Sequence, residues 1–135
     1  MRDVFLDTAP LIYLLETRGD RQKAIQNQLQ EWIRNGALFV SSVLTLTELL
    51  TGPRRDGNER LADQYRVALS QLLGRPLLTI DEKTANHAAS LRSRFRLRTP
   101  DALQLAAAVQ SGCAVFYTND KRLRECSDIE VVLVE

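Results

Sequence analysis

Short apolar runs alternate along this chain with longer stretches in which apolar residues recur every three or four positions. The short runs predict buried strands, and the recurring pattern predicts helices with one apolar face. The predicted strands cover residues 4–6, 37–41, 76–80, 114–118 and 129–134. The predicted helices cover residues 10–15, 20–35, 43–50, 59–73, 82–94 and 102–110.

Residues typical of helix ends support these boundaries. Side chains that can cap a helix precede three of the predicted helices, at Ser42, Asp81 and Thr99. Pro100 then fits the first helical position, where its missing N–H needs no partner. Gly52 and Pro53 are expected to end the third helix, which leaves residues 54–58 as a polar loop.

Strands separated by helices indicate an α/β domain with a mostly parallel central sheet of four to five strands. Several strands are apolar throughout, which is typical of a sheet covered by helices on both faces. In such sheets, ligands bind beyond the carboxyl ends of the strands, where the strand order reverses. The length of 135 residues fits a single domain, residues 1–135.

Several classes of protein are excluded by composition and by missing motifs. No apolar run approaches the roughly 20 residues of a membrane-spanning helix, and the N-terminal segment does not resemble a signal peptide. We therefore expect a cytoplasmic protein without membrane contact. Cys113 and Cys126 form no CxxC pair and His87 is the single histidine, so a zinc site is not expected. The GxGxxG and P-loop motifs of nucleotide enzymes are absent.

Four acidic residues stand where this fold would bring them together. Asp7 ends the first strand, and Asp120 follows the strand at 114–118 by two residues. Glu48 lies two turns into the helix after the second strand, and Asp101 lies in the first turn of a Leu- and Ala-rich helix. Converging carboxylates repel one another, and a hard divalent cation such as Mg²⁺ or Mn²⁺ offsets that repulsion. Such an ion can also stabilise charge on a transferring phosphate.

Each acid has an ordinary structural interpretation as well. Asp7 and Asp120 could be turn residues, and Asp101 could simply face the positive end of a helix dipole. Glu48 could be solvated, although the apolar residues around it in segment 44–50 argue against this. The joint pattern, rather than any single acid, favours a metal site.

Four short segments resemble the motifs of the PIN-domain family. They are Phe5-Leu6-Asp7-Thr8, Thr47-Glu48-Leu49, Thr99-Pro100-Asp101-Ala102-Leu103-Gln104-Leu105-Ala106 and Tyr117-Thr118-Asn119-Asp120. Their order and spacing are most similar to those of VapC-type toxins from toxin–antitoxin pairs. The resemblance spans nearly the whole chain, and the third segment is its most specific part.

The resemblance implies a PIN-like, Rossmann-like α/β/α sandwich and a Mg²⁺- or Mn²⁺-dependent endoribonuclease. Matched by motif, the catalytic and metal-binding acids are Asp7, Glu48, Asp101 and Asp120, with Thr118 helping to hold the site. Asp120 is preferred to its neighbour Asn119 because a carboxylate is the better ligand. The resemblance also implies an RNA substrate, a small antitoxin protein as partner and a homodimer.

Arginines near the acids are candidates for binding RNA. Four of them, Arg92, Arg94, Arg96 and Arg98, directly precede the Thr99-Pro100-Asp101 motif. Arginine pairs well with phosphate, and phosphate contacts supply most of the affinity for nucleic acid. We expect Arg94, Arg96 and Arg98 to contact the RNA backbone, with Arg54 and Arg55 on the opposite wall. The ordinary alternative is that these arginines are only solvated.

Two other functions remain open at this point. The first is another Mg²⁺-dependent phosphoryl-transfer enzyme on a similar sheet. A haloacid-dehalogenase-type phosphatase would need an acid where the chain has Ala9, and a receiver domain would need an early acidic pair that is missing. The second is a non-catalytic PIN-like scaffold that binds RNA or protein. Loss of a site acid would mark such a scaffold, and all four acids are present.

Overall fold

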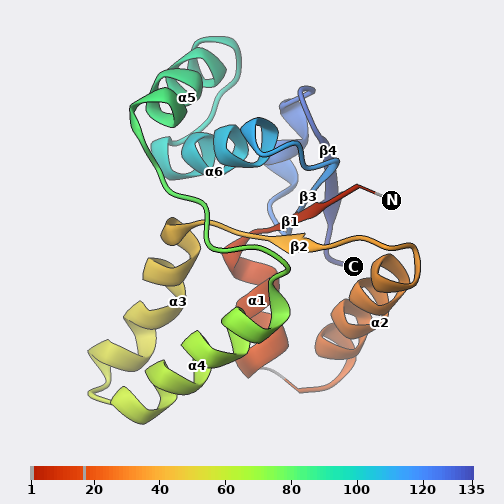
Figure 1. The fold of residues 1–135 in the computed structure, drawn as a ribbon, viewed down its shortest axis with the longest axis vertical. Helices are drawn as coiled ribbons and strands as arrows, with labels where there is room; N and C mark the ends of the chain where they lie inside the picture. Colours follow the sequence, from red (N-terminus) through yellow and green to blue (C-terminus); the bar gives the residue numbers. More distant parts are fainter. Residues whose placement is uncertain (1, 17) are drawn as a thin grey trace.

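The computed structural model describes residues 2–16 and 18–135 and arranges them in three layers, with a sheet between two groups of helices (Figure 1). The sheet of the described residues has four strands in the order β2-β1-β3-β4. All three strand pairs are parallel, which confirms the predicted class of fold. The strands are β1 (Val4–Leu6), β2 (Phe39–Val40), β3 (Val115–Thr118) and β4 (Glu130–Leu133).

Helices occupy all six stretches in which the apolar periodicity predicted them. They are α1 (Thr8–Glu16), α2 (Asp20–Arg34), α3 (Val43–Arg55), α4 (Glu59–Leu72), α5 (Glu82–Arg94) and α6 (Thr99–Gln110). A short 3-10 helix, η1 (Lys121–Glu125), follows β3 and was not predicted. Within the described residues, no helix is both long and apolar enough to cross a membrane.

The two faces of the sheet belong to two separate apolar clusters. Alternate residues of a strand point to opposite faces, so Val4 and Leu6 pack with α1, α2, α3 and α4. Phe5, between them, faces the other way and packs with α5 and α6. In β3, Phe116 shares the face of Phe5, and their stacked rings lie 5.1 Å apart. Figure 1 shows α5 and α6 on one side of the sheet and the first four helices on the other.

The prediction of a strand at residues 76–80 was wrong. Leu78 forms one isolated bridge with Ser42, and residues 76–80 contain no strand. The neighbouring strand β2 is only two residues long, and the chain turns into α3 directly after Ser42. Pro76 also has no N–H to donate to a ladder. The apolar side chains of this segment therefore pack on the core without extending the sheet.

Two predicted helix ends were also wrong. Helix α3 continues through Gly52 and Pro53 to Arg55, because Pro53 lies on the buried face near the last turn and interrupts few helical hydrogen bonds. Arg54 and Arg55 are therefore helical rather than in a loop. At the start of α6, Thr99 is already helical, and the extended N-cap residue is Arg98, whose side chain makes no capping hydrogen bond.

We predict that Leu105→Ala lowers the free energy of unfolding by about 2–5 kcal/mol, because a fully buried leucine leaves a cavity in the core. Urea denaturation monitored by circular dichroism measures this loss. Val67→Ala on the exposed side of α4 is the control, and it should change the free energy by no more than about 0.5 kcal/mol. Equal losses in the two variants would contradict the assignment of the core.

Candidate active site

A small cavity of about 160 Å³ lies at the carboxyl ends of β1 and β3 and holds all four predicted acids. The chain passes from β1 to β2 on one side and later places β3 on the other side, so the strand order reverses here. This is the position at which open parallel sheets bind ligands. The lining residues are Asp7, Thr8, Ala9, Glu48, Arg98, Pro100, Asp101, Gln104, Asn119 and Asp120.

Asp7 stands between β1 and α1 and is held from both sides. Its Oδ1 accepts a hydrogen bond from the backbone N–H of Thr8 at 2.9 Å, and its Oδ2 accepts one from the hydroxyl of Thr118 at 2.8 Å. The pKa of Asp7 is raised from 3.8 to about 6, mainly by burial. The nearby charges of Asp101 and Glu48 also raise it, and the two hydrogen bonds lower it. The site therefore disfavours the ionised form of Asp7 as long as no cation is near.

Glu48 reaches the cavity from the second turn of α3. Its Oε1 accepts a hydrogen bond from the hydroxyl of Thr8 at 2.8 Å, which ties α3 to the first residue of α1. Thr8 is buried, whereas Glu48 is exposed. The carboxylate therefore keeps contact with solvent while its position is fixed by a buried partner.

Asp101 and Asp120 each bind an arginine of the same chain. Arg98 Nε donates to Asp101 Oδ2 at 3.2 Å across the first turn of α6. Arg122 binds both oxygens of Asp120, with Nε to Oδ1 at 3.0 Å and Nη2 to Oδ2 at 2.7 Å. These hydrogen bonds hold the pKa of Asp120 below its usual range. Both arginines are more than half exposed, so solvent reaches the cavity beside them.

Asn119, the alternative to Asp120, makes a contact of its own at the rim of the cavity. Its side-chain amide donates to the hydroxyl of Tyr13 on α1 at 2.8 Å. Tyr13 in turn lies under the guanidinium of Arg21, 4.5 Å from the ring centroid. Asn119 thus joins the end of β3 to α1, and Asp120 supplies the carboxylate.

A buried polar network behind the acids was not singled out in the sequence. Gln104, one turn after Asp101 in α6, accepts a hydrogen bond from Ser42 and donates one to Thr45 Oγ1 at 2.8 Å. All three residues are almost completely buried. The network joins α6 to the first turn of α3 and so fixes the helix of Asp101 relative to the helix of Glu48. A glutamine within an otherwise Leu- and Ala-rich helix was the signal for it.

The chemistry of the four acids fits a hard divalent cation, because such ions take carboxylate oxygens as ligands. The side chains are not closed around a common point, however. Among the described residues, no three acidic, histidine or cysteine side chains are grouped tightly enough to hold an ion as they stand. Two of the four carboxylates are engaged by Arg98 and Arg122 instead.

The arginines proposed for RNA binding are spread over several surfaces. Arg98 lines the cavity, whereas Arg94 pairs with Asp128 and lies over the ring of Phe95. Arg54 pairs with Glu59 at 3.7 Å, in the last turn of α3. Arg55 and Arg96 are exposed. Arg92 donates to the backbone carbonyl of Leu97 and so fixes the turn before α6.

Comparison with known proteins identifies one family and several solved structures with the same fold. A family model for the PIN domain matches residues 4–128. No curated protein sequence matches the chain. A toxin–antitoxin complex from Klebsiella pneumoniae contains a similar chain, with a TM-score of 0.77 and 23% identity over 98% of each chain.

Two further solved structures share the fold. VapBC2 from Rickettsia felis, bound to a DNA fragment from its promoter, gives a TM-score of 0.79 with 16% identity over 98% of this chain and 99% of that one. VapC20 from Mycobacterium tuberculosis, described as a toxin that cleaves the sarcin–ricin loop, gives a TM-score of 0.63 with 17% identity over 84% and 86%. At these identities the similarity establishes the α/β/α fold.

We predict that the metal-free protein loses stability as the pH rises from about 4 to about 6. Asp7 binds its proton more tightly in the folded state, with a pKa of about 6 against an ordinary 3.8, so ionisation in this window favours unfolding. Asp7→Asn removes this penalty and should raise the free energy of unfolding at neutral pH by the order of 2–3 kcal/mol. Urea denaturation in EDTA at several pH values measures the effect.

Asp63→Asn makes the same chemical change on the exposed surface of α4 and is the control for this experiment. It should leave the pH profile of the parent protein unchanged. A flat profile in the parent, or a profile in Asp7→Asn that still falls between about pH 4 and 6, would refute the buried, protonated carboxyl.

Proposed function

Because this chain belongs to the PIN domain family, we propose that it is a metal-dependent endoribonuclease that hydrolyses RNA phosphodiester bonds. The observation that carries the proposal is the convergence of four carboxylates from separate elements on one solvent-open cavity. Like charges in such a cluster repel one another, and Asp101 and Glu48 add to the rise in the pKa of Asp7 that burial mainly causes. A bound divalent cation would offset the repulsion between the carboxylates.

In this proposal Asp7, Glu48, Asp101 and Asp120 hold Mg²⁺ or Mn²⁺. The bound cation would supply charge stabilisation for the phosphate and an activated water. Asp7 and Asp101 are the proposed direct ligands. Asp7 is fixed by hydrogen bonds to neutral donors only, which leaves its negative charge available for a cation.

Two threonines position these acids. Thr118 at the end of β3 holds Asp7 through its hydroxyl, and the same oxygen accepts the backbone N–H of Asp120 at 3.2 Å. Thr8 holds Glu48. The hydroxyls thereby fix the carboxylates of Asp7 and Glu48, and Thr118 also fixes the backbone of Asp120.

The RNA backbone is proposed to lie along the exposed arginines beside the cavity. Arg98 is at the cavity itself, and Arg96 is exposed two residues before it. Arg94, Arg54 and Arg55 would give weaker, more distant contacts, since Arg94 and Arg54 already pair with Asp128 and Glu59. Phosphate contacts of this kind give affinity without reading the sequence.

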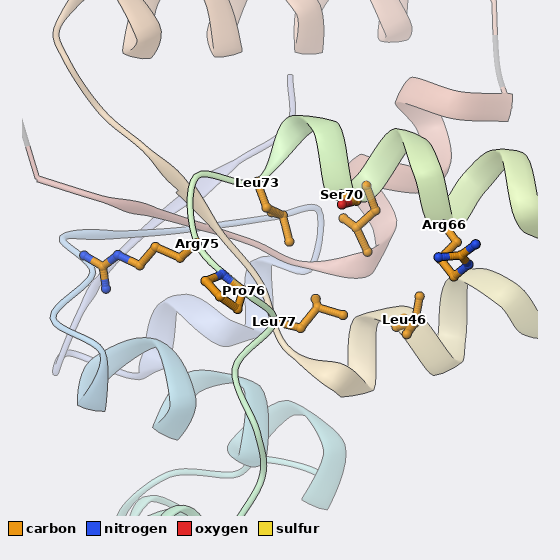
Figure 2. A pocket seen from close by; sticks show the side chains of 8 residues that line it. Leu46, Arg66, Ser70, Leu73, Arg75, Pro76 and Leu77 are labelled. Atoms are coloured by element: carbon orange, nitrogen blue, oxygen red, sulfur yellow. The ribbon is translucent and has the colours of Figure 1, made fainter.

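We further propose that the chain is the toxin of a toxin–antitoxin pair, acts in the cytoplasm and forms a homodimer. The toxin role is supported by similar structures that are named as a toxin–antitoxin complex and as a member of a family of toxin–antitoxin systems. An apolar cleft of about 310 Å³ between α3 and α4 is a suitable seat for a segment of the antitoxin. Figure 2 shows Leu46, Leu73 and Leu77 between Arg66 and Arg75, which lie at opposite ends of the lining. Arg66 and Arg75 already pair with Asp63 and Asp3, so the acidic flanks of an amphipathic segment would compete with these ion pairs.

We predict that Asp7→Asn and Asp101→Asn each reduce RNA cleavage by more than about 100-fold. Loss of groups that only support a metal ligand costs about 10- to 100-fold, so loss of a direct ligand should cost more. The assay compares Mg²⁺, Mn²⁺ and EDTA on fragments of tRNA, rRNA and mRNA, with the protein freed of any partner. Asp63→Asn serves as the control and should cleave normally. Cleavage that persists in EDTA or in either site variant would refute the proposal.

We predict that Leu46→Glu prevents co-purification of the antitoxin, because it places a negative charge in the apolar cleft against an acidic partner. The partner is tested by co-expressing the product of the neighbouring gene. Val67→Glu, on the exposed side of α4, is the matched control and should still retain the partner. Retention of the partner by both variants would show that the antitoxin binds outside this cleft. Metal-dependent cleavage of RNA by Leu46→Glu protein without a partner should be unchanged.

A further inference from the structure

Arg122 binds the carboxylate of Asp120 more completely than any other pairing at the cavity. It lies in η1, two residues after Asp120, and its Nε and Nη2 grip the two carboxylate oxygens as a fork. The backbone N–H of Arg122 adds a third hydrogen bond to Oδ1 at 3.0 Å. Arg98 offers Asp101 a single hydrogen bond at 3.2 Å. A two-pronged guanidinium contact is the arrangement in which arginine binds carboxylate or phosphate best.

This contact conflicts with the use of Asp120 as a ligand. Both oxygens of the carboxylate face N–H donors, and a positive charge already sits where it neutralises Asp120. The situation of Asp7 is different, because its two partners are an uncharged hydroxyl and an uncharged amide. A cation entering the cavity must therefore compete with Arg122 for Asp120, whereas at Asp7 it meets no competing charge.

Arg122 is free to move once the carboxylate is taken from it. Its side chain is 64% exposed, and its only ion pair with a described residue is the one to Asp120. The backbone N–H of Arg122 can continue to cap η1 through Asp120 while the guanidinium turns away. If RNA binds at this cavity, the displaced guanidinium can bind a phosphate oxygen of the strand, because its planar donors match the geometry of phosphate.

We propose that Arg122 alternates between two anions: it neutralises Asp120 while the cavity lacks a cation, and it binds an RNA phosphate when the cation takes Asp120. The binding of Arg122 to an RNA phosphate rests on the proposed nuclease function, whereas its competition with the cation for Asp120 does not. Arg122 is then a substrate-binding residue that also weakens the intrinsic affinity of the site for metal.

The test measures metal and RNA separately in Arg122→Gln, with Arg124→Gln as the matched control. Arg124 carries the same charge, is exposed on the same turn and forms no ion pair with a described residue. Titration calorimetry with Mn²⁺ alone should show tighter binding in Arg122→Gln by about fivefold, the scale expected for removal of an exposed ion pair. Arg124→Gln should change the affinity by less than about twofold, because salt screens a distant charge.

RNA binding should change in the opposite direction. With Mn²⁺ saturating, Arg122→Gln should raise the KM for RNA by about tenfold or more, as expected for loss of a charged hydrogen bond to phosphate. The slope of log affinity against log salt for a single strand should fall by about 0.7. Arg122→Lys keeps the positive charge but loses the two-pronged contact. It should therefore have the salt slope of the parent protein and a KM between those of the parent and Arg122→Gln.

Each result decides a different part of the inference. Unchanged Mn²⁺ affinity in Arg122→Gln would refute the competition for Asp120, and the contact would then serve only to cap η1. Tighter Mn²⁺ binding with unchanged KM and salt slope would refute the phosphate contact. If the parent protein cleaves no RNA, the proposed function fails, yet the Mn²⁺ titration still decides whether Arg122 competes with the metal. Circular dichroism checks that all variants fold.

Discussion

The hydrogen bond between Thr118 and Asp7 depends on the parallel pairing of β1 with β3. Leu6 and Tyr117 are register partners, so the next residues along the two strands, Asp7 and Thr118, emerge side by side at the carboxyl edge. Thr8, the first residue of α1, lies at the same edge and donates the hydrogen bond to Glu48. The hydroxyls of Thr118 and Thr8 thereby fix Asp7 and Glu48. The buried Gln104 network fixes α6, which carries Asp101, relative to α3.

The electrostatic consequence of this geometry is a cluster of acids whose mutual repulsion, in our proposal, a bound cation would offset. Burial, with a smaller contribution from neighbouring charge, makes ionised Asp7 costly. Arg122 favours the ionised form of Asp120, and Arg98 pairs with Asp101. The chain thus carries counter-charges of its own beside two of the four acids. We interpret these arginines as the reason why four acids can line one cavity in a folded protein. Both arginines are also more than half exposed, and we propose that they contact the RNA backbone.

Much of the fold could be predicted from the sequence, because the apolar strands β1 and β3 and the periodic helices carry strong local signals. The failures have local causes. Residues 76–80 have the composition of a strand, but pairing requires a partner ladder, and β2 is too short to provide one beyond Ser42. Helix α3 passes through Pro53 because tertiary burial outweighs the loss of a hydrogen bond near its end.

The four acids of the site could be predicted from the sequence, but their contacts with the surrounding side chains could not. The motifs indicated which carboxylates belong to one edge, and all of them line the cavity. The contact between Arg122 and Asp120 could not be foreseen, since it depends on the 3-10 turn after β3, which has no periodic signal.

The most direct test of the central claim is a crystal structure of the protein with Mn²⁺, with the ion located by its anomalous scattering. Our account predicts a peak in the cavity beside Asp7 and Asp101, with the guanidinium of Arg122 turned away from Asp120. A cavity without a peak, with Arg98 and Arg122 still bound to their carboxylates at saturating Mn²⁺, would contradict the assignment of this cluster as a metal site.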